Sequence, residues 1–388
     1  MRKNIAVVTG SRAEYGLLRN LLFLIRDSPE FNLKLYVTGM HLSKKYGNTF
    51  KEIINDNIEI YKKIDIRINS DDPYSVSSSI SIGINKFAKS FKGSKIDLLI
   101  ILGDRYELLS AVIPACFENI PIAHIHGGET TEGVLDEAIR HAITKFSSIH
   151  FVANEVYRRR VIQLGERPSR VFKVGGMGID AIASTKLLSL EEIQKKLKIK
   201  IKKKSLLVTY HPETLQRENT NDNVNELILS LDKLKDTTIL ITLPNADPDN
   251  LKIISSFKKF ANNNSNVHLF KSLGQVNYFS LLSLVDGVLG NSSSGLLEAP
   301  YFCKGTINIG DRQRGRLKPK SVIDCIAKAE SISEALLKLY SKKFKEKLRK
   351  IDSPYGKKGA SKKIYQILKK IEFDNLIQKK FFDVDFNW

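Results

Sequence analysis

The sequence predicts an α/β protein with two doubly wound domains, each built on a parallel sheet. Short apolar runs rich in β-branched residues alternate with segments of helical length, and a polar, glycine-rich or charged cluster follows nearly every run. Continuous rather than alternating apolar character is typical of strands buried on both faces, and helical connections suit right-handed crossovers. The length of 388 residues suits two domains of ordinary size.

The first domain is expected over residues 1–183. Its strands are predicted at 5–10, 33–39, 96–104, 121–128, 148–154 and 170–176. Gly176, Gly178 and Ala181 form a G-x-G-x-x-A pattern after the last of these runs, which is a possible dinucleotide fingerprint. The acidic residue that should follow comes too soon, and no new series of strands follows at once. A bend between domains is therefore the favoured interpretation.

The second domain is expected over residues 184–365, after a joint that turns polar and lysine-rich. Its strands are predicted at 205–212, 237–244, 267–272, 285–291 and 305–311. After about residue 325 the strand pattern stops and helical periodicity continues. Residues 366–388 are expected to form a terminal helix and tail that can cross back to the first domain.

The composition is that of an ordinary globular protein, with 42% hydrophobic and 27% charged residues, and it excludes a disordered, collagenous or membrane-embedded chain. The net charge of +20 gathers mainly in residues 191–204 and 338–370. A lysine-rich surface is the favoured interpretation, and a basic nucleic-acid-binding protein is the alternative of another class. Three widely spaced cysteines and the lack of a long apolar run indicate a cytoplasmic protein without disulfides or membrane contact.

Polar clusters at the predicted strand ends point to one ligand site. They read GSRAEYG at 10–16, GDR at 103–105, HIHGGE at 124–129, HPE at 211–213, PNAD at 244–247, GNSSSG at 290–295 and GDRQRGR at 310–316. Ligands of open α/β sheets bind beyond the carboxyl ends of the strands. Because both halves contribute clusters, we expect a cleft between the two domains.

The segment GNSSSGLLEAP, at 290–300, is the clearest candidate anion site. A strand ends, three serines and a glycine follow, and a helix begins, so backbone N–H groups and hydroxyls can face a phosphate. The simpler alternative is a helix cap with spare serines. The candidate phosphate ligands are Ser292, Ser293, Ser294, Arg12, Arg312 and Arg316, and Glu298 can accept hydrogen bonds from ribose.

The candidate acids and bases are Asp104, Glu129, Asp136 and His211. Asp104 follows a buried run and precedes Arg105, so partial burial can tune its pKa; an ion pair or a helix cap is the alternative. Asp136 and Arg140, like Glu137 and His141, stand four residues apart on a predicted helix. No set of side chains has a trustworthy metal-ligand spacing, so no metal is expected.

These motifs, with VTGMHLSKKYGNT, DEAIRHAITK and INIGDRQRGR, resemble the hydrolysing UDP-N-acetylglucosamine 2-epimerases of bacterial sialic acid synthesis. They are also similar to the epimerase part of the animal bifunctional enzyme. The motifs occur in order, with family-like spacing, over nearly the whole chain. The resemblance implies two Rossmann-like domains that face each other across a cleft, in the glycosyltransferase-B arrangement, and neither metal nor nicotinamide as cofactor.

The resemblance also implies roles for individual residues. UDP is expected to be held by Arg12, Arg105, His211, Asn245, Ser292, Ser293, Glu298 and Arg312, with Asp104, Glu129 and Asp136 as acid and base candidates. Several relatives carry a glutamate where this chain has His126, which leaves open the base of the first step. Glu129 is the preferred candidate, because some hydrolysing members share the HIHGGE form.

The expected reaction converts UDP-N-acetylglucosamine to N-acetylmannosamine and UDP. The hydrogen on sugar carbon 2 is not acidic, so UDP is expected to leave first, giving a 2-acetamidoglycal that then adds water. One alternative applies this chemistry to a UDP- or GDP-linked 2,4-diacetamido-2,4,6-trideoxyglucose of legionaminic acid synthesis, and another is a retaining glycosyltransferase. The expected partners are the UDP-sugar, the product UDP and further copies of the chain in a homodimer or homotetramer.

Overall fold

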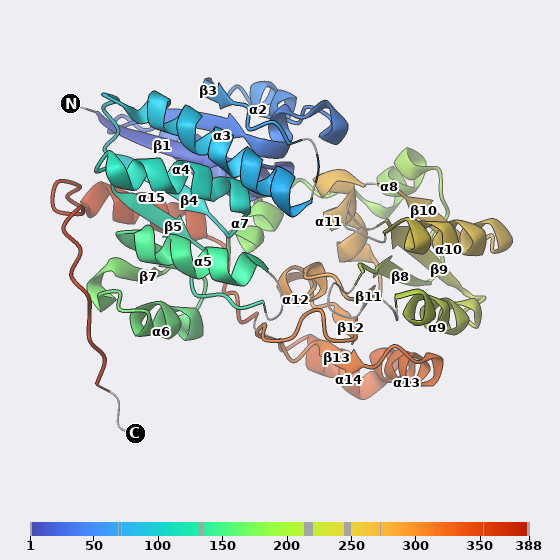
Figure 1. Cartoon of the computed structure of the whole chain (residues 1–388). Helices are drawn as coiled ribbons and strands as arrows, with labels where there is room; N and C mark the ends of the chain where they lie inside the picture. Colours follow the sequence, from blue (N-terminus) through green and yellow to red (C-terminus); the bar gives the residue numbers. More distant parts are fainter. Residues whose placement is uncertain are drawn as a thin grey trace. The chain divides into compact units, whose positions relative to one another are not determined.

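The computed structural model describes residues 2–68, 70, 72–131, 135–212, 220–243, 250–271, 273–351 and 353–385. The chain divides into two compact units (Figure 1). Unit 1 comprises residues 1–130, 135–183 and 355–388, and unit 2 comprises residues 131–134 and 184–354. The chain re-enters unit 1 at Tyr355, earlier than the expected start of the terminal segment at residue 366.

Unit 1 is built on a seven-stranded parallel sheet in the order β3-β2-β1-β4-β5-β6-β7. Its strands are β1 (Lys3–Thr9), β2 (Phe31–Thr38), β3 (Ile60–Ile64), β4 (Leu98–Leu102), β5 (Ile122–Ile125), β6 (Ile149–Val152) and β7 (Val171–Lys173). Its helices are α1 (Arg12–Arg26), α2 (Phe50–Asn55), α3 (Pro73–Phe91), α4 (Tyr106–Phe117), α5 (Leu135–Phe146), α6 (Glu155–Gln163), α7 (Met177–Ser184) and α15 (Ala360–Lys370). The strand order reverses at β1, whose neighbours are β2 and β4.

Alternate residues of β1 enter two separate cores. Ile5 and Val7 pack with α1, α2, α7 and α15 on one face of the sheet. Ala6 and Val8 pack with α3, α4 and α5 on the other. Burial of both faces explains why the strands read as continuous apolar runs.

Unit 2 repeats this plan with the strand order β10-β9-β8-β11-β12-β13, again all parallel. Its strands are β8 (Lys204–Thr209), β9 (Thr237–Thr242), β10 (Val267–Phe270), β11 (Gly287–Gly290), β12 (Gly305–Ile309) and β13 (Val322–Cys325). Its helices are α8 (Leu190–Leu197), α9 (Thr220–Asp232), α10 (Asn250–Asn263), α11 (Gly274–Leu284), α12 (Ser294–Leu297), α13 (Ala329–Tyr340) and α14 (Lys342–Leu348). The predicted fold class, two doubly wound α/β units, is confirmed.

The C-terminal segment is fastened to unit 1 by ionic and backbone contacts. Lys379 pairs with the buried Glu166 at 2.8 Å and donates to the carbonyls of Lys145 and Ser147, at the end of α5. Arg170 donates to the carbonyl of Asn375. The contacts of Lys379 satisfy carbonyls that the end of α5 leaves without a helical partner.

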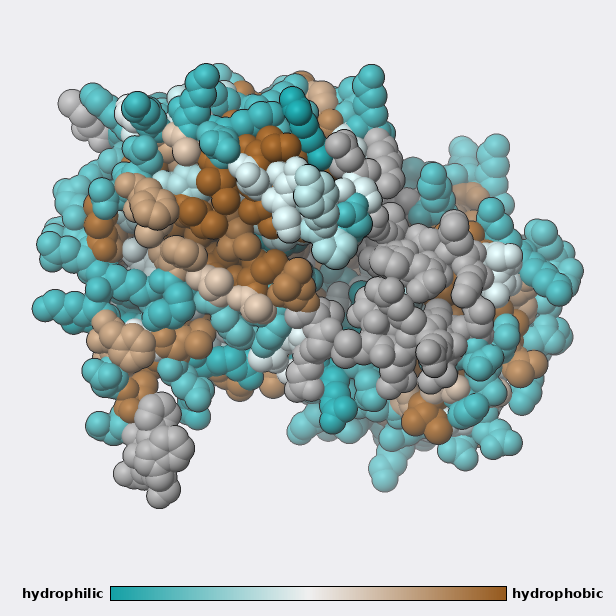
Figure 2. Space-filling model, viewed as in Figure 1, coloured by the Kyte–Doolittle hydropathy of each residue, from teal (hydrophilic) through white to brown (hydrophobic). Residues whose placement is uncertain are grey.

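Apolar side chains gather over α3 and α4 on the face seen in Figure 2. Phe117, at the end of α4, is 84% exposed, and Leu109 and Ile113 of the same helix are half-buried. A patch of this kind is typical of protein interaction surfaces. No helix in the described ranges is long and apolar enough to span a membrane.

Candidate active site

In unit 1, Arg140 on α5 joins three polar segments at the carboxyl end of the sheet. Its Nη2 donates to the Asp104 carboxylate, which follows β4, and its Nη1 donates to Glu137 Oε2 at 2.6 Å. The same Nη1 donates to the backbone carbonyl of Glu129 at 2.9 Å. Arg140 is only 2% exposed, so the two carboxylates balance a buried cation. The guanidinium fork thereby sets the positions of Asp104 and of the segment that carries Glu129.

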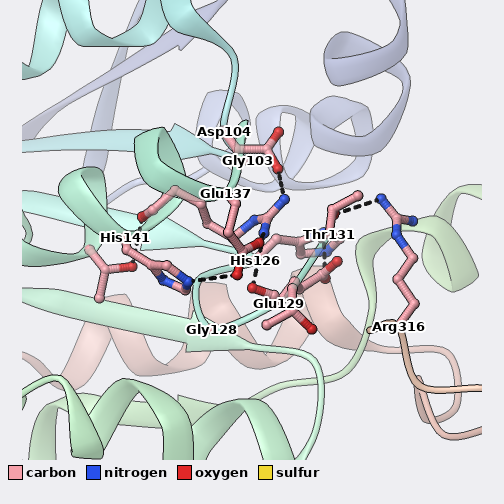
Figure 3. A network of polar contacts seen from close by, with 12 residues as sticks. Gly103, Asp104, His126, Gly128, Glu129, Thr131, Glu137, His141 and Arg316 are labelled. Atoms are coloured by element: carbon pink, nitrogen blue, oxygen red, sulfur yellow. Dashed lines mark hydrogen bonds and ion pairs between the residues drawn. The ribbon is translucent and has the colours of Figure 1, made fainter. Parts of the chain in front are cut away.

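His126 contacts Glu129 from the loop after β5 (Figure 3). Its Nδ1 lies 3.3 Å from Glu129 Oε1, and its Nε2 accepts a hydrogen bond of 3.1 Å from the Met177 backbone N–H. The backbone of His126 has φ +69°, in the left-handed region that most residues avoid. The imidazole therefore holds the Glu129 carboxylate from a conformation that the surrounding contacts enforce.

The first turns of α5 carry three further ionisable groups. Asp136 is an exposed residue, but neighbouring groups shield part of its carboxyl from water. This desolvation and the nearby Asp104 charge raise the pKa of the carboxyl. Glu137 accepts from Arg140 and contacts His141 Nε2 at 3.0 Å, which is the predicted pair four residues apart. A carboxyl that holds its proton more strongly is suited to act as an acid, and the Asp104 carboxylate lies nearby in its contact with Arg140.

In unit 2, His211 and Asn291 close the point at which the strand order reverses, between β8 and β11. The backbone N–H of His211 donates to Asn291 Oδ1 at 2.7 Å, and Asn291 Nδ2 donates to the carbonyl of His211 at 2.9 Å. Gly290, with φ +134°, precedes this clasp, and a Cβ there would lie 2.0 Å from the Thr209 carbonyl oxygen. Only glycine allows the two strand ends to approach so closely.

The serine loop begins directly after this clasp. Ser292 Oγ accepts from the Ser294 backbone N–H at 3.4 Å, and Ser294 Oγ accepts from the Tyr278 hydroxyl at 2.5 Å. Ser293 precedes α12, so the expected order of strand, serines and helix is present. Burial raises the pKa of Glu298, while the Ser294 hydroxyl and the Arg316 charge counteract the rise. The loop thus combines hydroxyls with a carboxyl group whose pKa is raised.

Three side chains after β12 complete the polar surface of unit 2. Arg312 Nη1 and Gln313 Nε2 both donate to the Asn291 carbonyl, at 3.2 and 2.8 Å. Arg316 Nη2 donates to Thr131 Oγ1 at 3.4 Å (Figure 3). The two arginines and the serine loop therefore give unit 2 cationic and hydroxyl groups of the kind that bind phosphate.

Two of the remaining predicted ligands, Arg12 and Arg105, have partners within unit 1. Arg12 pairs with Glu52 at 2.9 Å on the surface, and Arg105 Nε donates to Glu107 at 2.5 Å. Asn245 lies outside the described residues. The structure brings Asp104 and Glu129 together through Arg140, and it brings His211 beside Asn291 and Arg312.

Three residues of these clusters are not among the candidates from the sequence: Tyr278, Asn291 and Gln313. Arg140 and His126 are named there without these contacts, and the strongest contacts of Arg140 lie with residues far away in the sequence or three positions away. Asn291 carried a usable signal, because an asparagine directly after a buried strand can clasp the neighbouring strand end.

Comparisons with known proteins identify the family to which the chain belongs. A family described as UDP-N-acetylglucosamine 2-epimerase matches residues 24–369. The chain belongs to this family. A Campylobacter jejuni "GDP/UDP-N,N'-diacetylbacillosamine 2-epimerase (hydrolyzing)" is 39% identical over 99% of this chain and 100% of its own length. An Escherichia coli "polysialic acid biosynthesis protein P7" is also 39% identical, over 98% of both chains.

Two further comparisons extend this result. A Legionella pneumophila "UDP-N,N'-diacetylbacillosamine 2-epimerase (hydrolyzing)" is 33% identical, over 98% of this epimerase and 99% of its own chain. A crystal structure of a Methanocaldococcus jannaschii UDP-GlcNAc 2-epimerase, in complex with UDP-GlcNAc and UDP, has the same fold, with a TM-score of 0.78 and 18% identity. The structural match covers 95% of this chain and 99% of the M. jannaschii chain. This chain therefore shares its family with these relatives and its fold with the solved epimerase.

Proposed function

We propose that this epimerase releases the 2-epimer of a UDP-linked 2-acetamido sugar by elimination of UDP and addition of water. The observation that carries the proposal is the Arg140 cluster, which holds Asp104, Glu137 and the Glu129 backbone together. Several carboxylates around one buried guanidinium provide both a proton acceptor and a proton donor near a reacting carbon.

In the first step, the bond between carbon 1 and the diphosphate oxygen breaks, and UDP leaves with the bonding electrons. Glu129, oriented by His126, takes the hydrogen of carbon 2 as a proton, and a double bond forms between carbons 1 and 2. The charge that develops on the diphosphate is stabilised by hydroxyl and guanidinium groups of unit 2, namely those of Ser292, Ser293 and Arg312. His211 belongs to the same cluster and supports the diphosphate through its neighbour Asn291.

In the second step, water adds across the double bond of the glycal. Asp136, whose pKa is raised, donates its proton to carbon 2 from the opposite face, and oxygen from water bonds to carbon 1. Asp104 takes the proton that water loses. Both carboxyl groups then exchange protons with solvent, and Glu129 releases the one it gained.

The substrate that we propose first is a UDP-linked 2,4-diacetamido-2,4,6-trideoxy sugar. Two of the relatives named above are diacetylbacillosamine epimerases, at 39% and 33% identity. UDP-N-acetylglucosamine, giving N-acetylmannosamine for sialic acid, is the second candidate, because the relative from E. coli takes its name from polysialic acid synthesis.

One experiment tests both the chemistry and the substrate. The purified protein is incubated with each of the two UDP-sugars, and with the GDP-linked form, in deuterated water, and the released sugar is identified by NMR. We expect release of a free 2-epimer with deuterium at carbon 2. Retention of the original hydrogen would exclude the elimination route, and release of UDP only in the presence of an acceptor sugar would indicate a glycosyltransferase.

A further inference from the structure

Two buried glutamates lie beside the turn after β1 in unit 1. Glu14 belongs to the first turn of α1 and is 6% exposed, and Glu107 belongs to the first turn of α4 and is fully buried. These helices follow β1 and β4, the neighbouring strands at which the strand order reverses. Ligands of doubly wound sheets bind beyond this point. Neither glutamate has a part in the two steps described above.

Each glutamate has one oxygen with a partner and one without. Glu14 Oε2 accepts from the Gly10 backbone N–H at 2.7 Å, and Glu107 Oε1 accepts from Arg105 Nε at 2.5 Å. Glu14 Oε1 and Glu107 Oε2 are buried, and neither has a hydrogen-bond partner among the described residues. Buried polar atoms are seldom left without partners.

Glu107 packs directly against the residue that Glu14 binds. A Cβ on Gly10 would lie 2.8 Å from both Cγ and Oε1 of Glu107, so only glycine fits between the turn and this side chain. The Glu107 charge raises the pKa of Glu14, so the two buried carboxyl groups repel each other when both are ionised. One proton taken up by the pair removes this repulsion.

The charged groups around the pair favour this state. Burial and the Glu107 charge raise the pKa of Glu14 to about 8, although Arg105 counteracts the rise. Burial lowers the pKa of His41, whose backbone N–H donates to the Gly10 carbonyl, to about 4, so His41 is neutral above pH 6.

Two further titratable groups lie near the pair. Tyr106 lies beside Arg105, with its ring centroid 5.9 Å from the guanidinium carbon. Asp136 feels the charges of both Glu107 and Arg105. A change in the charge of the pair therefore also affects the pKa of Asp136, the proposed acid of the second step.

We propose that Glu14 and Glu107 share one proton and act together as a positioning unit for the diphosphate ligands of unit 1. Glu107 aims the Arg105 guanidinium, and Glu14 shapes the turn from Gly10 to Arg12. With the shared proton, Glu14, Glu107 and Arg105 have no net charge. Without it they carry one negative charge, which repels a diphosphate. That the ligand is a diphosphate rests on the proposed function.

The shared proton is tested on the protein without ligand. In Glu14→Gln, the amide oxygen can still accept from Gly10 and the amide NH₂ can donate to Glu107, as the protonated carboxyl does. Since the folded-state pKa of Glu14 is about 8, against 4.5 for the ordinary group, ionisation of the wild type destabilises the folded state as the pH rises through this window. The urea midpoint of E14Q should therefore exceed that of the wild type by an amount that grows from pH 5 to pH 8 and is constant above.

A matched control is Glu30→Gln, which changes a half-exposed glutamate paired with Lys369 in the same unit. Its midpoint should differ from that of the wild type by the same amount at every pH. If the E14Q difference is equally flat, Glu14 is ionised throughout and the shared proton is refuted.

The positioning role is tested by calorimetric titration with UDP between pH 7 and pH 9.5, where the terminal phosphate is already fully ionised. The wild-type Kd should rise about tenfold through pH 8, as expected for one uncompensated charge at a partly buried site, and the E14Q Kd should stay constant. Glu107→Gln should bind more weakly at every pH, because Arg105 loses its carboxylate partner, while E30Q follows the wild type.

Parallel pH profiles of wild type and E14Q would overturn the positioning role. If the wild type binds no UDP at any pH, the proposed function fails, and the unfolding measurements alone then decide whether the proton is shared.

Discussion

The backbone N–H of Met177 donates a hydrogen bond of 3.1 Å to Nε2 of His126. Since Nε2 accepts, the ring hydrogen resides on Nδ1, which lies 3.3 Å from Glu129 Oε1. A residue 51 positions along the chain thus selects the tautomer that can donate to the carboxylate. The His126 ring therefore positions the Glu129 carboxylate.

Replacing His126 by glycine tests this positioning role. Glycine keeps the left-handed backbone without strain and removes the ring, so we expect kcat to fall about 10²-fold, as for a misplaced catalytic group. The melting temperature should stay the same or rise, because the strain at φ +69° is relieved. A variant with unchanged kcat would show that His126 does not orient Glu129.

Arg140 should be needed for both stability and turnover. Arg140→Met leaves Asp104 and Glu137 without their cation, and we expect a loss of about 3 to 5 kcal/mol in the free energy of unfolding, measured with urea. Arg140→Lys should fold better but remain impaired in kcat, because an ammonium lacks the planar fork that reaches three acceptors. In the control Arg26→Met, which breaks the exposed pair with Asp27, the loss should stay below about 1 kcal/mol.

Substitutions of the carboxylates and of the serine loop should have different kinetic effects. Asp104→Asn and Glu129→Gln should each lower turnover about 10²- to 10⁴-fold, the usual contribution of an acid or base. Their Kd for UDP, measured by calorimetry, should be unchanged. Ser292→Ala should instead weaken UDP binding and leave kcat at saturating substrate largely intact. Near-normal turnover in D104N would show that Asp104 is not the acceptor assigned to it.

The folded state should lose stability as the pH falls from about 6.5 to about 3. Burial lowers the pKa of His124 from 6.5 to about 3 and that of His41 to about 4, so the unfolded chain binds protons that the folded chain does not. His124→Gln can still donate to the Gly103 carbonyl, which lies 2.8 Å from the histidine Nε2. Its urea midpoint should depend less on pH in this window than that of the wild type, and equal slopes would exclude His124 as a cause.

The interior strands of both sheets were predictable, whereas β3 and β13 were missed. Both lie at sheet edges, where one side has no neighbour and the burial that produces an apolar run is incomplete. In β3 the sequence IYKKI leaves Tyr61, Lys62 and Lys63 exposed. Charged and exposed residues are usual on edge strands, so the hydrophobic pattern identifies the edge strands β7 and β10 but misses β3 and β13.

The sequence by itself determined the two doubly wound folds and the chemical types of the site residues, because buried strands require apolar runs and strand ends collect polar side chains. It also carried enough ordered motifs to indicate the epimerase family. Only the tertiary structure decided the partners: Arg140 with Asp104, Met177 with His126, and Asn291 with His211. Each of these contacts joins segments distant in the chain. A hydrogen bond depends on distance and direction in space, and residue spacing along the chain does not encode either one.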